Sequence, residues 1–497
     1  MLARKRGSLV DRVATSMRIR PNREDYLRLS EEFDLVPVQA ELSADLETPV
    51  SAYLKVCAGR SPSFLLESVE QGDQIGRYSW LGCEPSETLI WNGDGNPWDG
   101  LAQKLNAIRV APMSDVPFPG GVVGYWGYET IRHLEPRVPL AAVDDLPLPE
   151  AAFMLTRGVI AFDHVRRTLR IIAFAGSPDG YEQAQALIED WAARLRAPLL
   201  AEPLELGTPT GDLAITSNRS REDYEAAVSK AQEHILAGDI FQLVLSQRLS
   251  APYEGDAFSL YRVLRAINPS PYMFFQDWGS FQLVGSSPEV MVRLDGRKAM
   301  VRPIAGTRRR GEVPDAELAE DLLGDPKERA EHLMLVDLGR NDLGRVCVPG
   351  SVKVDELMRI ERYSHVLHIV SNVHGELQPG KTGLDLLAAC FPAGTVSGSP
   401  KIRAMELIAK LEPTRRGPYS GAVGVLGFDG TINTGITIRT MVVADGRVHV
   451  QAGAGIVADS TPAGEYQETL SKAQALLQAL QSAPPAAHAP KAAFEGA

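Results

Sequence analysis

The sequence predicts an α+β fold built of layered sheets and helices. Short apolar runs typical of strands are separated by longer amphipathic segments typical of helices. Asp429-Gly430 and Asp445-Gly446 each lie between two strand-like runs, as expected for hairpin turns. No internal repeat of fixed period accompanies this alternation.

The same patterns place the expected elements in order along the chain. The N-terminal part has three strand-like runs and one amphipathic helical run, and the C-terminal part mixes both kinds. The expected strands are 63–68, 89–91, 158–162, 239–249, 280–293, 302–306, 421–428 and 448–451; the expected helices are 181–195, 223–236, 325 to about 338, 402 onwards and 465–480.

Charge and cysteine usage exclude several classes of protein. The 51 Lys and Arg against 63 Asp and Glu give a net charge of −12, so no general field attracts nucleic acid or an anionic membrane surface. The four cysteines form no CxxC pair, and no apolar run is long enough to span a bilayer. We expect a cytoplasmic protein that partners neither nucleic acid nor a membrane.

Changes in composition suggest the domain organisation. A Pro- and Gly-rich stretch at 197–213 is expected to link an N-terminal lobe, 21–205, to a C-terminal lobe, 213–481. The basic segment 1–20 is expected to be a poorly ordered extension, and the Ala- and Pro-rich segment 482–497 a disordered tail.

Two predicted helices carry the same acidic spacing. Asp325 is a good N-cap for the first, and Glu328 and Glu331 then share one of its faces. Glu465 and Glu468 repeat this spacing on the second helix. Helix capping and an exposed Glu–Lys pair explain these acids without any function. Alternatively, the two pairs converge on Mg²⁺, which prefers carboxylate oxygens.

Three further segments are open to a structural or a functional interpretation. Gly453-Ala454-Gly455 is expected to form a tight turn after the strand ending at Gln451, either an ordinary hairpin turn or a nest of amides for a carboxylate. The small-residue loop 391–401 is either a connection or an anion cradle at a helix N-terminus. His365 and His368 are either structural or acid–base groups.

Taken together, five segments resemble the signatures of chorismate-utilising enzymes, most closely the large-subunit family called anthranilate synthase component I. The likeness covers about residues 20–480. It implies a two-lobed α/β sandwich-like fold with largely antiparallel sheets, and a cleft in the C-terminal lobe for chorismate and Mg²⁺. The segments are 302–307, 331–342, 362–368, 391–401 and 451–456.

The resemblance also implies roles for individual residues. Glu331 and Glu468 would bind Mg²⁺ directly, and Glu328 and Glu465 through water. The remaining residues would hold chorismate: Lys472 and the amides of Gly453, Ala454 and Gly455 at the ring carboxylate, and Tyr419 and Arg439 at the enolpyruvyl carboxylate, with Thr395 nearby.

The implied reaction is lyase chemistry: ammonia adds at C2 with loss of the C4 hydroxyl, and pyruvate is then eliminated to give anthranilate. Glu289 matches the family's candidate acid, and His368 matches the histidine tied to elimination. Members that add water have a lysine base at the position of Gln242, and members that make 4-amino-4-deoxychorismate have a lysine nucleophile at the position of Ala305. Both lysines are missing here, which favours the ammonia route to anthranilate and hence tryptophan biosynthesis.

A feedback site for tryptophan is also implied by the resemblance. It comprises two segments from different parts of the chain, with an aromatic and methionine surface suited to an indole. Its residues would be Glu67, Ser68, Pro271, Tyr272, Met273 and Phe274.

We expect no glutaminase domain in this sequence, because none of its cysteines has the required Gly-flanked surroundings. Ammonia would therefore come from a separate glutamine amidotransferase subunit in a heterodimer or heterotetramer. Two alternatives remain: an aminodeoxyisochorismate synthase that stops before pyruvate elimination, and a non-catalytic tryptophan-sensing subunit.

Overall fold

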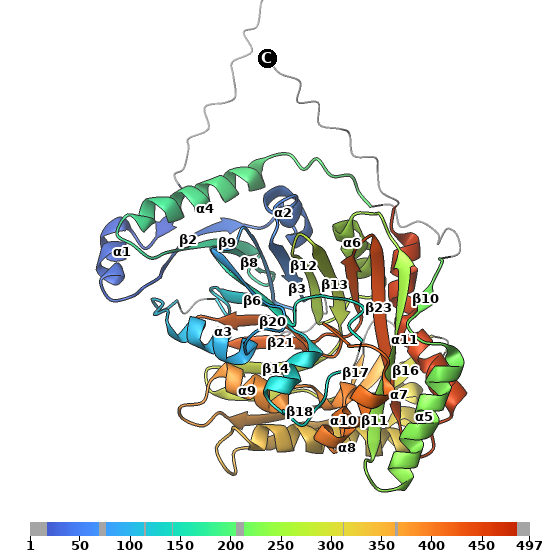
Figure 1. Ribbon diagram of the computed structural model, residues 1–497. Helices are drawn as coiled ribbons and strands as arrows, with labels where there is room; N and C mark the ends of the chain where they lie inside the picture. Colours follow the sequence, from blue (N-terminus) through green and yellow to red (C-terminus); the bar gives the residue numbers. More distant parts are fainter. Residues whose placement is uncertain are drawn as a thin grey trace, which may run out of the picture.

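The computed structural model describes residues 17–68, 76–113, 116–141, 143–204, 213–311, 313–362 and 366–484. Two large sheets and the helices around them make up the molecule (Figure 1). Every pairing between the named strands is antiparallel. The predicted fold of layered, antiparallel sheets with flanking helices is therefore confirmed.

The first sheet has 13 strands and draws on both halves of the chain. They are β1 (Ile19–Arg20), β2 (Val36–Ser43), β3 (Ser63–Glu67), β4 (Tyr78–Cys83), β8 (Gly158–Asp163), β9 (Thr168–Ala175), β10 (Thr216–Ser217), β11 (Gln242–Pro252), β12 (Tyr272–Asp277), β13 (Phe281–Ser287), β19 (Gly398–Ser399), β22 (Thr440–Ala444) and β23 (Arg447–Ile456). Their order is β1-β2-β9-β8-β4-β3-β12-β13-β22-β23-β11-β10, with β19 pairing to β11.

The second sheet has 10 strands and also combines both halves. They are β5 (Glu87–Trp91), β6 (Gly121–Trp126), β7 (Ala151–Leu155), β14 (Val290–Asp295), β15 (Lys298–Val301), β16 (Ile304–Arg309), β17 (Lys353–Arg362), β18 (Val366–Glu376), β20 (Ala422–Gly427) and β21 (Ile432–Ile436). Their order is β16-β18-β15-β14-β21-β20-β6-β7-β5, with β17 pairing to β18.

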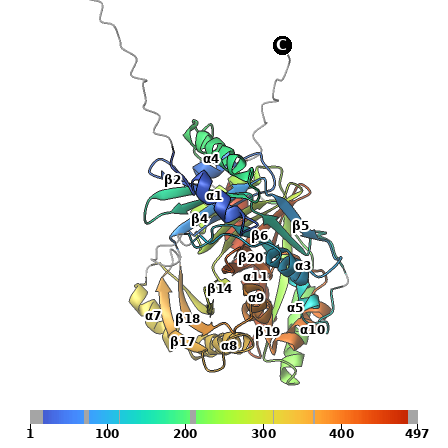
Figure 2. The ribbon, with the colours of Figure 1, turned by 90° about the vertical axis from the view of Figure 1, so that its left-hand side faces the viewer.

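The helices lie around these sheets, with α4 at one end of the molecule and α8 at the other (Figures 1 and 2). They are α1 (Arg23–Ser30), α2 (Pro49–Val56), α3 (Pro97–Asn106), α4 (Gly180–Arg196), α5 (Arg221–Leu236), α6 (Ala257–Ile267), α7 (Asp315–Gly324), α8 (Pro326–Gly344), α9 (Gly383–Cys390), α10 (Lys401–Leu411) and α11 (Pro462–Ser482), with short 3-10 helices η1 (Tyr128–His133) and η2 (Gly394–Val396).

Local sequence signals explain where several helices begin. Asp325 accepts hydrogen bonds from the backbone amides of Lys327 and Glu328, and Pro326 occupies the first helical position of α8, as predicted. At α9, Thr382 and Asp385 form a reciprocal capping box. None of the helices among the described residues is long and apolar enough to span a membrane.

The two sheets pack face to face through a shared apolar cluster. Phe64, Phe274 and Leu283 of the first sheet contact Tyr125 and Val425 of the second within this buried cluster. Larger clusters lie beneath the helices on the outer faces. Strands from both predicted lobes, 21–205 and 213–481, lie in both sheets, so the described parts of the two lobes share a continuous core.

Two expected elements differ from the observed ones. The run 280–293 was expected to be one strand, but it is divided into β13 and β14, which lie in different sheets. Pro288 lies at the break, since its ring nitrogen cannot donate a ladder hydrogen bond. The expected strand 448–451 instead continues to Ile456, so Gly453-Ala454-Gly455 is part of β23 and the predicted turn is wrong.

The two predicted disordered ends lie mostly outside the described residues. The described chain begins at residue 17 and ends at residue 484. The last two residues of the predicted extension, Ile19 and Arg20, form β1 and pair with Ala40 and Gln39 of β2.

Candidate active site

Glu289 lies where the chain passes from β13 to β14, and so from one sheet to the other. It is only 5% exposed, and its Oε1 accepts a 2.6 Å hydrogen bond from Oγ1 of Thr395. Burial raises the pKa of Glu289 to about 7, although Thr395 and the nearby cations Arg439 and Lys472 favour the ionised form. A carboxyl group that is half protonated near neutral pH is suited to general acid catalysis.

The loop 391–401 places Thr395 within hydrogen-bond distance of the Glu289 carboxyl group. Thr395 lies in η2, and the loop then forms β19, which pairs with β11 at Gln242. A Cβ on Gly398, whose φ is 143°, would lie 2.2 Å from the carbonyl oxygen of Gln242. Only glycine therefore lets the loop approach β11 this closely. The loop is a packed part of the site.

His368 lies on β18 opposite Thr307 of β16, beside a bulge at Gly306. Its Nδ1 is 2.9 Å from the carbonyl oxygen of Gly306 and 3.2 Å from Oγ1 of Thr307. Because a carbonyl group can only accept, Nδ1 carries the proton and Nε2 the lone pair of the neutral ring. Burial lowers the pKa of His368, which favours this neutral form. The neighbouring His365 lies outside the described residues.

Arg439 adds a partly buried positive charge between β21 and β22. Burial lowers its pKa, while Tyr419, Glu289 and Glu468 act in the opposite direction. Its backbone adopts a φ of 51°, and its carbonyl group accepts a 3.0 Å hydrogen bond from Ser286. Among the described residues its guanidinium group has no hydrogen-bond or ion-pair partner. A partly buried guanidinium group without such a partner is suited to binding a carboxylate.

The glycines of β23 give two polar side chains room to approach the strand. A Cβ on Gly453 would lie 2.8 Å from the hydroxyl oxygen of Tyr419, and one on Gly455 would lie 2.6 Å from Nε2 of Gln242. Gly453 and Gly455 therefore serve close approach here, where the sequence suggested a turn. β22 pairs with β23 only as far as Val450, so one edge of the glycine segment has no described strand beside it. Backbone groups on that edge are available to a ligand.

Gln242 itself is nearly fully buried at the first position of β11. Its Oε1 has no hydrogen-bond partner among the described residues. An unpaired buried amide oxygen is costly, so it indicates a place where a donor is to be bound.

The four predicted metal ligands come from α8 and α11. The pKa of Glu331 is raised, first by burial and then by the negative charges of Glu328 and Glu468, so the acids of the two helices face each other. Burial also raises the pKa of Glu465, whose Oε2 has no hydrogen-bond partner in the described structure. Nζ of Lys472 lies 2.7 Å from Oε1 of Glu468.

Two of these acids are paired with cations in the structure. Arg308 lies 3.2 Å from Glu328, and Lys472, paired with Glu468, also donates to the carbonyl group of Gly453 at 3.0 Å. Within the described residues, no group of three or more His, Cys, Asp or Glu is arranged to hold a metal ion. The donor chemistry nevertheless fits Mg²⁺, since that ion is commonly held by one or two carboxylates with water and substrate.

The two segments that carry the six predicted inhibitor residues are neighbours in the structure. β3 pairs with β12, which places Glu67 opposite Met273. The carboxylate of Glu67 accepts hydrogen bonds from Tyr261 at 2.6 Å and from Arg265 at 2.9 and 3.1 Å. The hydroxyl group of Ser68 is buried without a partner among the described residues. The other four are Pro271, Tyr272, Met273 and Phe274, of which Tyr272 donates to Asn433 at 2.7 Å.

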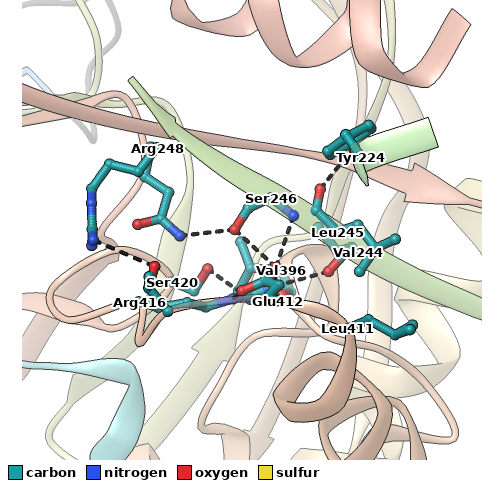
Figure 3. A network of polar contacts seen from close by, with 12 residues as sticks. Tyr224, Val244, Leu245, Ser246, Arg248, Val396, Leu411, Glu412, Arg416 and Ser420 are labelled. Carbon is teal, nitrogen blue, oxygen red and sulfur yellow. Dashed lines mark hydrogen bonds and ion pairs between the residues drawn. The ribbon is translucent and has the colours of Figure 1, made fainter. Parts of the chain in front are cut away.

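Three charged residues at the site were missed in the sequence. Arg416 and Glu412 form a buried ion pair (Figure 3). Glu129 of η1 accepts hydrogen bonds from the backbone amides of Arg416 and Gly417 at 2.7 and 3.0 Å. The spacing of Glu412 and Arg416 was visible, but it is the same as that of an ordinary exposed helix pair.

Comparison with known proteins gives a consistent answer along the chain. The family described as chorismate binding enzyme matches residues 61–478. Anthranilate synthase component 1 of Synechocystis is 52% identical, with 93% of this chain and 99% of that protein covered. The Streptomyces coelicolor protein of the same name is 48% identical, with 94% and 93% covered.

Solved structures agree. Anthranilate synthase component I of Streptococcus pneumoniae superposes with a TM-score of 0.75 at 36% identity, covering 88% of this chain and 98% of that one. The menaquinone-specific isochorismate synthase of Escherichia coli shares the fold, with a TM-score of 0.70 at 18% identity over 92% of this chain and 98% of that one. With a family match over most of its length and close relatives over nearly all of it, the chain belongs to the chorismate-binding enzymes, within the family of anthranilate synthase component 1.

Proposed function

We propose that this chain is the chorismate-binding subunit of an anthranilate synthase, a lyase of tryptophan biosynthesis. It converts chorismate and ammonia into anthranilate, pyruvate and water. The observation that carries this proposal is the buried carboxyl group of Glu289, whose pKa of about 7 lets it act as an acid beside the unpaired guanidinium group of Arg439. The nearby neutral imidazole of His368 supplies a base.

The two carboxylates of chorismate are held by different groups. Arg439 and the hydroxyl group of Tyr419 hold the enolpyruvyl carboxylate, with Thr395 nearby. Lys472 and the backbone of Gly453, Ala454 and Gly455 hold the ring carboxylate. The available edge of β23 and the contact of Lys472 with Gly453 support this assignment.

Glu289 acts in the first half of the reaction. As the C2–N bond forms and the ring double bonds shift, the C4–O bond breaks, and Glu289 gives its proton to the departing hydroxide, which leaves as water. The proton lost by the added nitrogen restores Glu289. Without this acid, hydroxide is a poor leaving group.

His368 acts in the second half. Nε2 takes the proton from C2 while the C3–O bond breaks, which forms the aromatic ring and releases pyruvate after the proton is passed to its enolate. The hydrogen bond from Nδ1 to Gly306 holds the ring in the tautomer that this step needs.

Mg²⁺ is the proposed cofactor, with Glu331 and Glu468 as direct ligands and Glu328 and Glu465 acting through water. When bound, the ion neutralises the ring carboxylate and orients the substrate. The unpaired Oε2 of Glu465 and the mutual repulsion of the acids support a cation between α8 and α11.

Gln242 favours ammonia over water as the nucleophile. A neutral amide cannot deprotonate water, but its unpaired, buried Oε1 can accept a hydrogen bond from ammonia. Ala305 offers no amine for a covalent adduct. A separate glutamine amidotransferase subunit supplies the ammonia, consistent with the name component 1 of the relatives.

A product assay tests the function. Purified chain, chorismate, Mg²⁺ and ammonium are incubated, and anthranilate fluorescence and released pyruvate are recorded together. We expect equal amounts of both. Aminodeoxyisochorismate without pyruvate would instead identify a synthase that stops before elimination, and tryptophan binding without any turnover would identify a sensing subunit.

The pH dependence of kcat/KM is expected to identify Glu289 as the acid. With free ammonia held constant, activity should fall as the pH rises through about 7, because the raised pKa leaves Glu289 protonated only below that value. Burial also raises the pKa of Glu129 to about 7, so a variant is needed to show which of the two carboxyl groups causes the decline in kcat/KM. Thr395→Val removes a hydrogen bond to Glu289 alone and should move this decline to higher pH. An unmoved decline would exclude Glu289.

We also propose that tryptophan inhibits the enzyme at the site formed by Glu67, Ser68 and the segment 271–274. Ser68→Ala is expected to raise the tryptophan concentration for half-inhibition about 3- to 10-fold, since one hydrogen bond to the inhibitor is lost. Ser63→Ala, which removes another buried hydroxyl group from β3, the strand that Ser68 follows, is the control. Equal inhibition curves for the two variants would place the inhibitor elsewhere.

A further inference from the structure

Arg416 is the charged residue with the most extensive contacts near the proposed site (Figure 3). Its side chain is 1% exposed, and that of its partner Glu412 is 3% exposed. Burial disfavours the charged form, but the ion pair with Glu412 outweighs this effect and keeps the pKa of Arg416 raised. The residue is therefore a permanent buried cation.

All the donors of this guanidinium group are used. Nε and Nη2 bind the two carboxylate oxygens of Glu412 at 2.8 and 2.6 Å, and Nη2 also donates to the carbonyl group of Val244 at 2.8 Å. Nη1 donates to the carbonyl group of Val396 at 2.7 Å and to the hydroxyl group of Ser420 at 3.1 Å. A guanidinium group has five N–H donors, and each has one acceptor here.

The acceptors lie beside residues of the proposed active site. Val396 follows Thr395, Ser420 follows Tyr419, and Val244 lies two residues after Gln242 on β11. The guanidinium group of Arg416 thus joins three segments. They carry Thr395, which donates to Glu289, Tyr419, proposed to bind the substrate, and Gln242, proposed to bind ammonia.

Glu412 and Glu129 hold this arrangement from two sides. Oε1 of Glu412 also accepts from the amide and hydroxyl groups of Ser246 on β11, at 2.8 and 2.9 Å. Glu129 comes from the N-terminal lobe and binds the backbone at Arg416 and Gly417. The guanidinium group further lies over the rings of Tyr128 and Tyr419, with 4.7 and 5.6 Å to their centres.

We propose that Arg416 is a positioning residue of the reaction, which sets the relative placement of Thr395, Tyr419 and Gln242 through the chain segments that it joins. This inference rests on the proposed function of the site. Lysine cannot replace arginine here, because its ammonium group is a single point with three donors.

The test uses the link from Arg416 to Glu289. Arg416 holds Val396, and Thr395 next to it donates to Glu289. The other charged groups that act on Glu289 are Arg439 and Lys472, which no variant changes. In Arg416→Lys, loss of the Thr395 hydrogen bond should raise the pH at which kcat/KM declines by about one unit and lower kcat/KM at least about tenfold.

A second variant keeps the test valid if Arg416→Lys is poorly folded. Glu412→Leu combined with Arg416→Met removes both charges, so that neither is left buried without its partner. The carbonyl groups of Val244 and Val396 lose their donor, so we expect the melting temperature to fall, and the pH profile is recorded below the unfolding transition of the variant. The folded double variant should show the same shift in pH profile. Combined with Thr395→Val, it should produce no further shift, since the same hydrogen bond is already lost.

A control is the partly buried ion pair of Glu47 and Lys55, far from the site in the predicted N-terminal lobe. Glu47→Leu combined with Lys55→Met should leave the pH profile unchanged. A wild-type pH profile in the folded Arg416→Met double variant would overturn the inference.

The titration of Glu289 can also be followed without turnover. Infrared spectra of the chain are recorded over a range of pH, and those of Glu289→Gln are subtracted to isolate the Glu289 carboxyl group. A raised carboxyl pKa in the double variant supports the positioning role, and an unchanged one overturns it. A wild-type chain that forms no anthranilate would instead refute the proposed function, so the two failures are distinguishable.

Discussion

Glu289→Gln should reduce anthranilate formation by about 10²- to 10⁴-fold, the usual contribution of a general acid. The amide has the shape of the carboxyl group and can still accept from Thr395, whose bond to Glu289 is 2.6 Å. It cannot supply a proton to the departing C4 hydroxide. The measurement is kcat/KM for anthranilate formation at constant free ammonia, and the variant should lose the decline near pH 7.

The same substitution should increase stability at alkaline pH. The pKa of Glu289 is raised from 4.5 to about 7 by burial. Between these values the native chain holds a proton that the unfolded chain has released, so the free energy of unfolding of the wild type falls as the pH rises. This loss amounts to about 3 kcal/mol and is absent in the glutamine variant. Thermal unfolding at pH 5 and pH 8 measures the difference, and a variant destabilised equally at both would contradict the buried, raised carboxyl group.

Most elements could be predicted because their signals are local. The helix at 223–236 is observed as α5, and the start of α8 follows from Asp325 and Pro326. The assignment of strands to sheets could not be predicted. The apolar run 280–293 has one continuous pattern, and nothing local indicates that it passes between sheets at Pro288 and Glu289.

The glycines of β23 show why a correct residue can be given the wrong local structure. Gly453 and Gly455 usually mark a turn. In the fold they lie in a strand, because Tyr419 and Gln242 occupy the space that side chains would take. Those neighbours are distant in sequence, and so the reason for glycine is visible only in the tertiary structure.

The contribution of Arg416 depends equally on tertiary structure. The spacing of Glu412 and Arg416 in the sequence is typical of an exposed ion pair, which contributes little to the free energy of unfolding. The contacts with Val244 and Val396 arise only when two segments distant in sequence meet Arg416. The candidate acids and cations could be named from motifs, whereas the groups that hold them in position could not.

Glu331→Gln should lower turnover at least about 100-fold, because a proposed direct ligand of Mg²⁺ is lost. Glu465→Gln, which changes a ligand proposed to act through water, should lower turnover about 10- to 100-fold, and excess Mg²⁺ should partly restore it. Calorimetric titration with Mg²⁺ in the presence of chorismate gives a readout independent of turnover, and affinity should fall in the same order. Chelation of the metal should abolish activity of the wild-type chain.

Asp337→Asn is the matched control for these variants, since it removes one exposed carboxylate from the same helix α8, where Asp337 pairs with Arg340. Mg²⁺ affinity should remain at the wild-type value in this variant. The net charge of −12 makes the control necessary, because any lost carboxylate weakens general attraction of a cation. Equal losses of Mg²⁺ affinity in Glu331→Gln and Asp337→Asn would show that Mg²⁺ is attracted only by the net negative charge and not bound at a specific site. A loss confined to the acids between α8 and α11 would locate the ion there, where it converts mutually repelling carboxylates into a receptor for an anionic substrate.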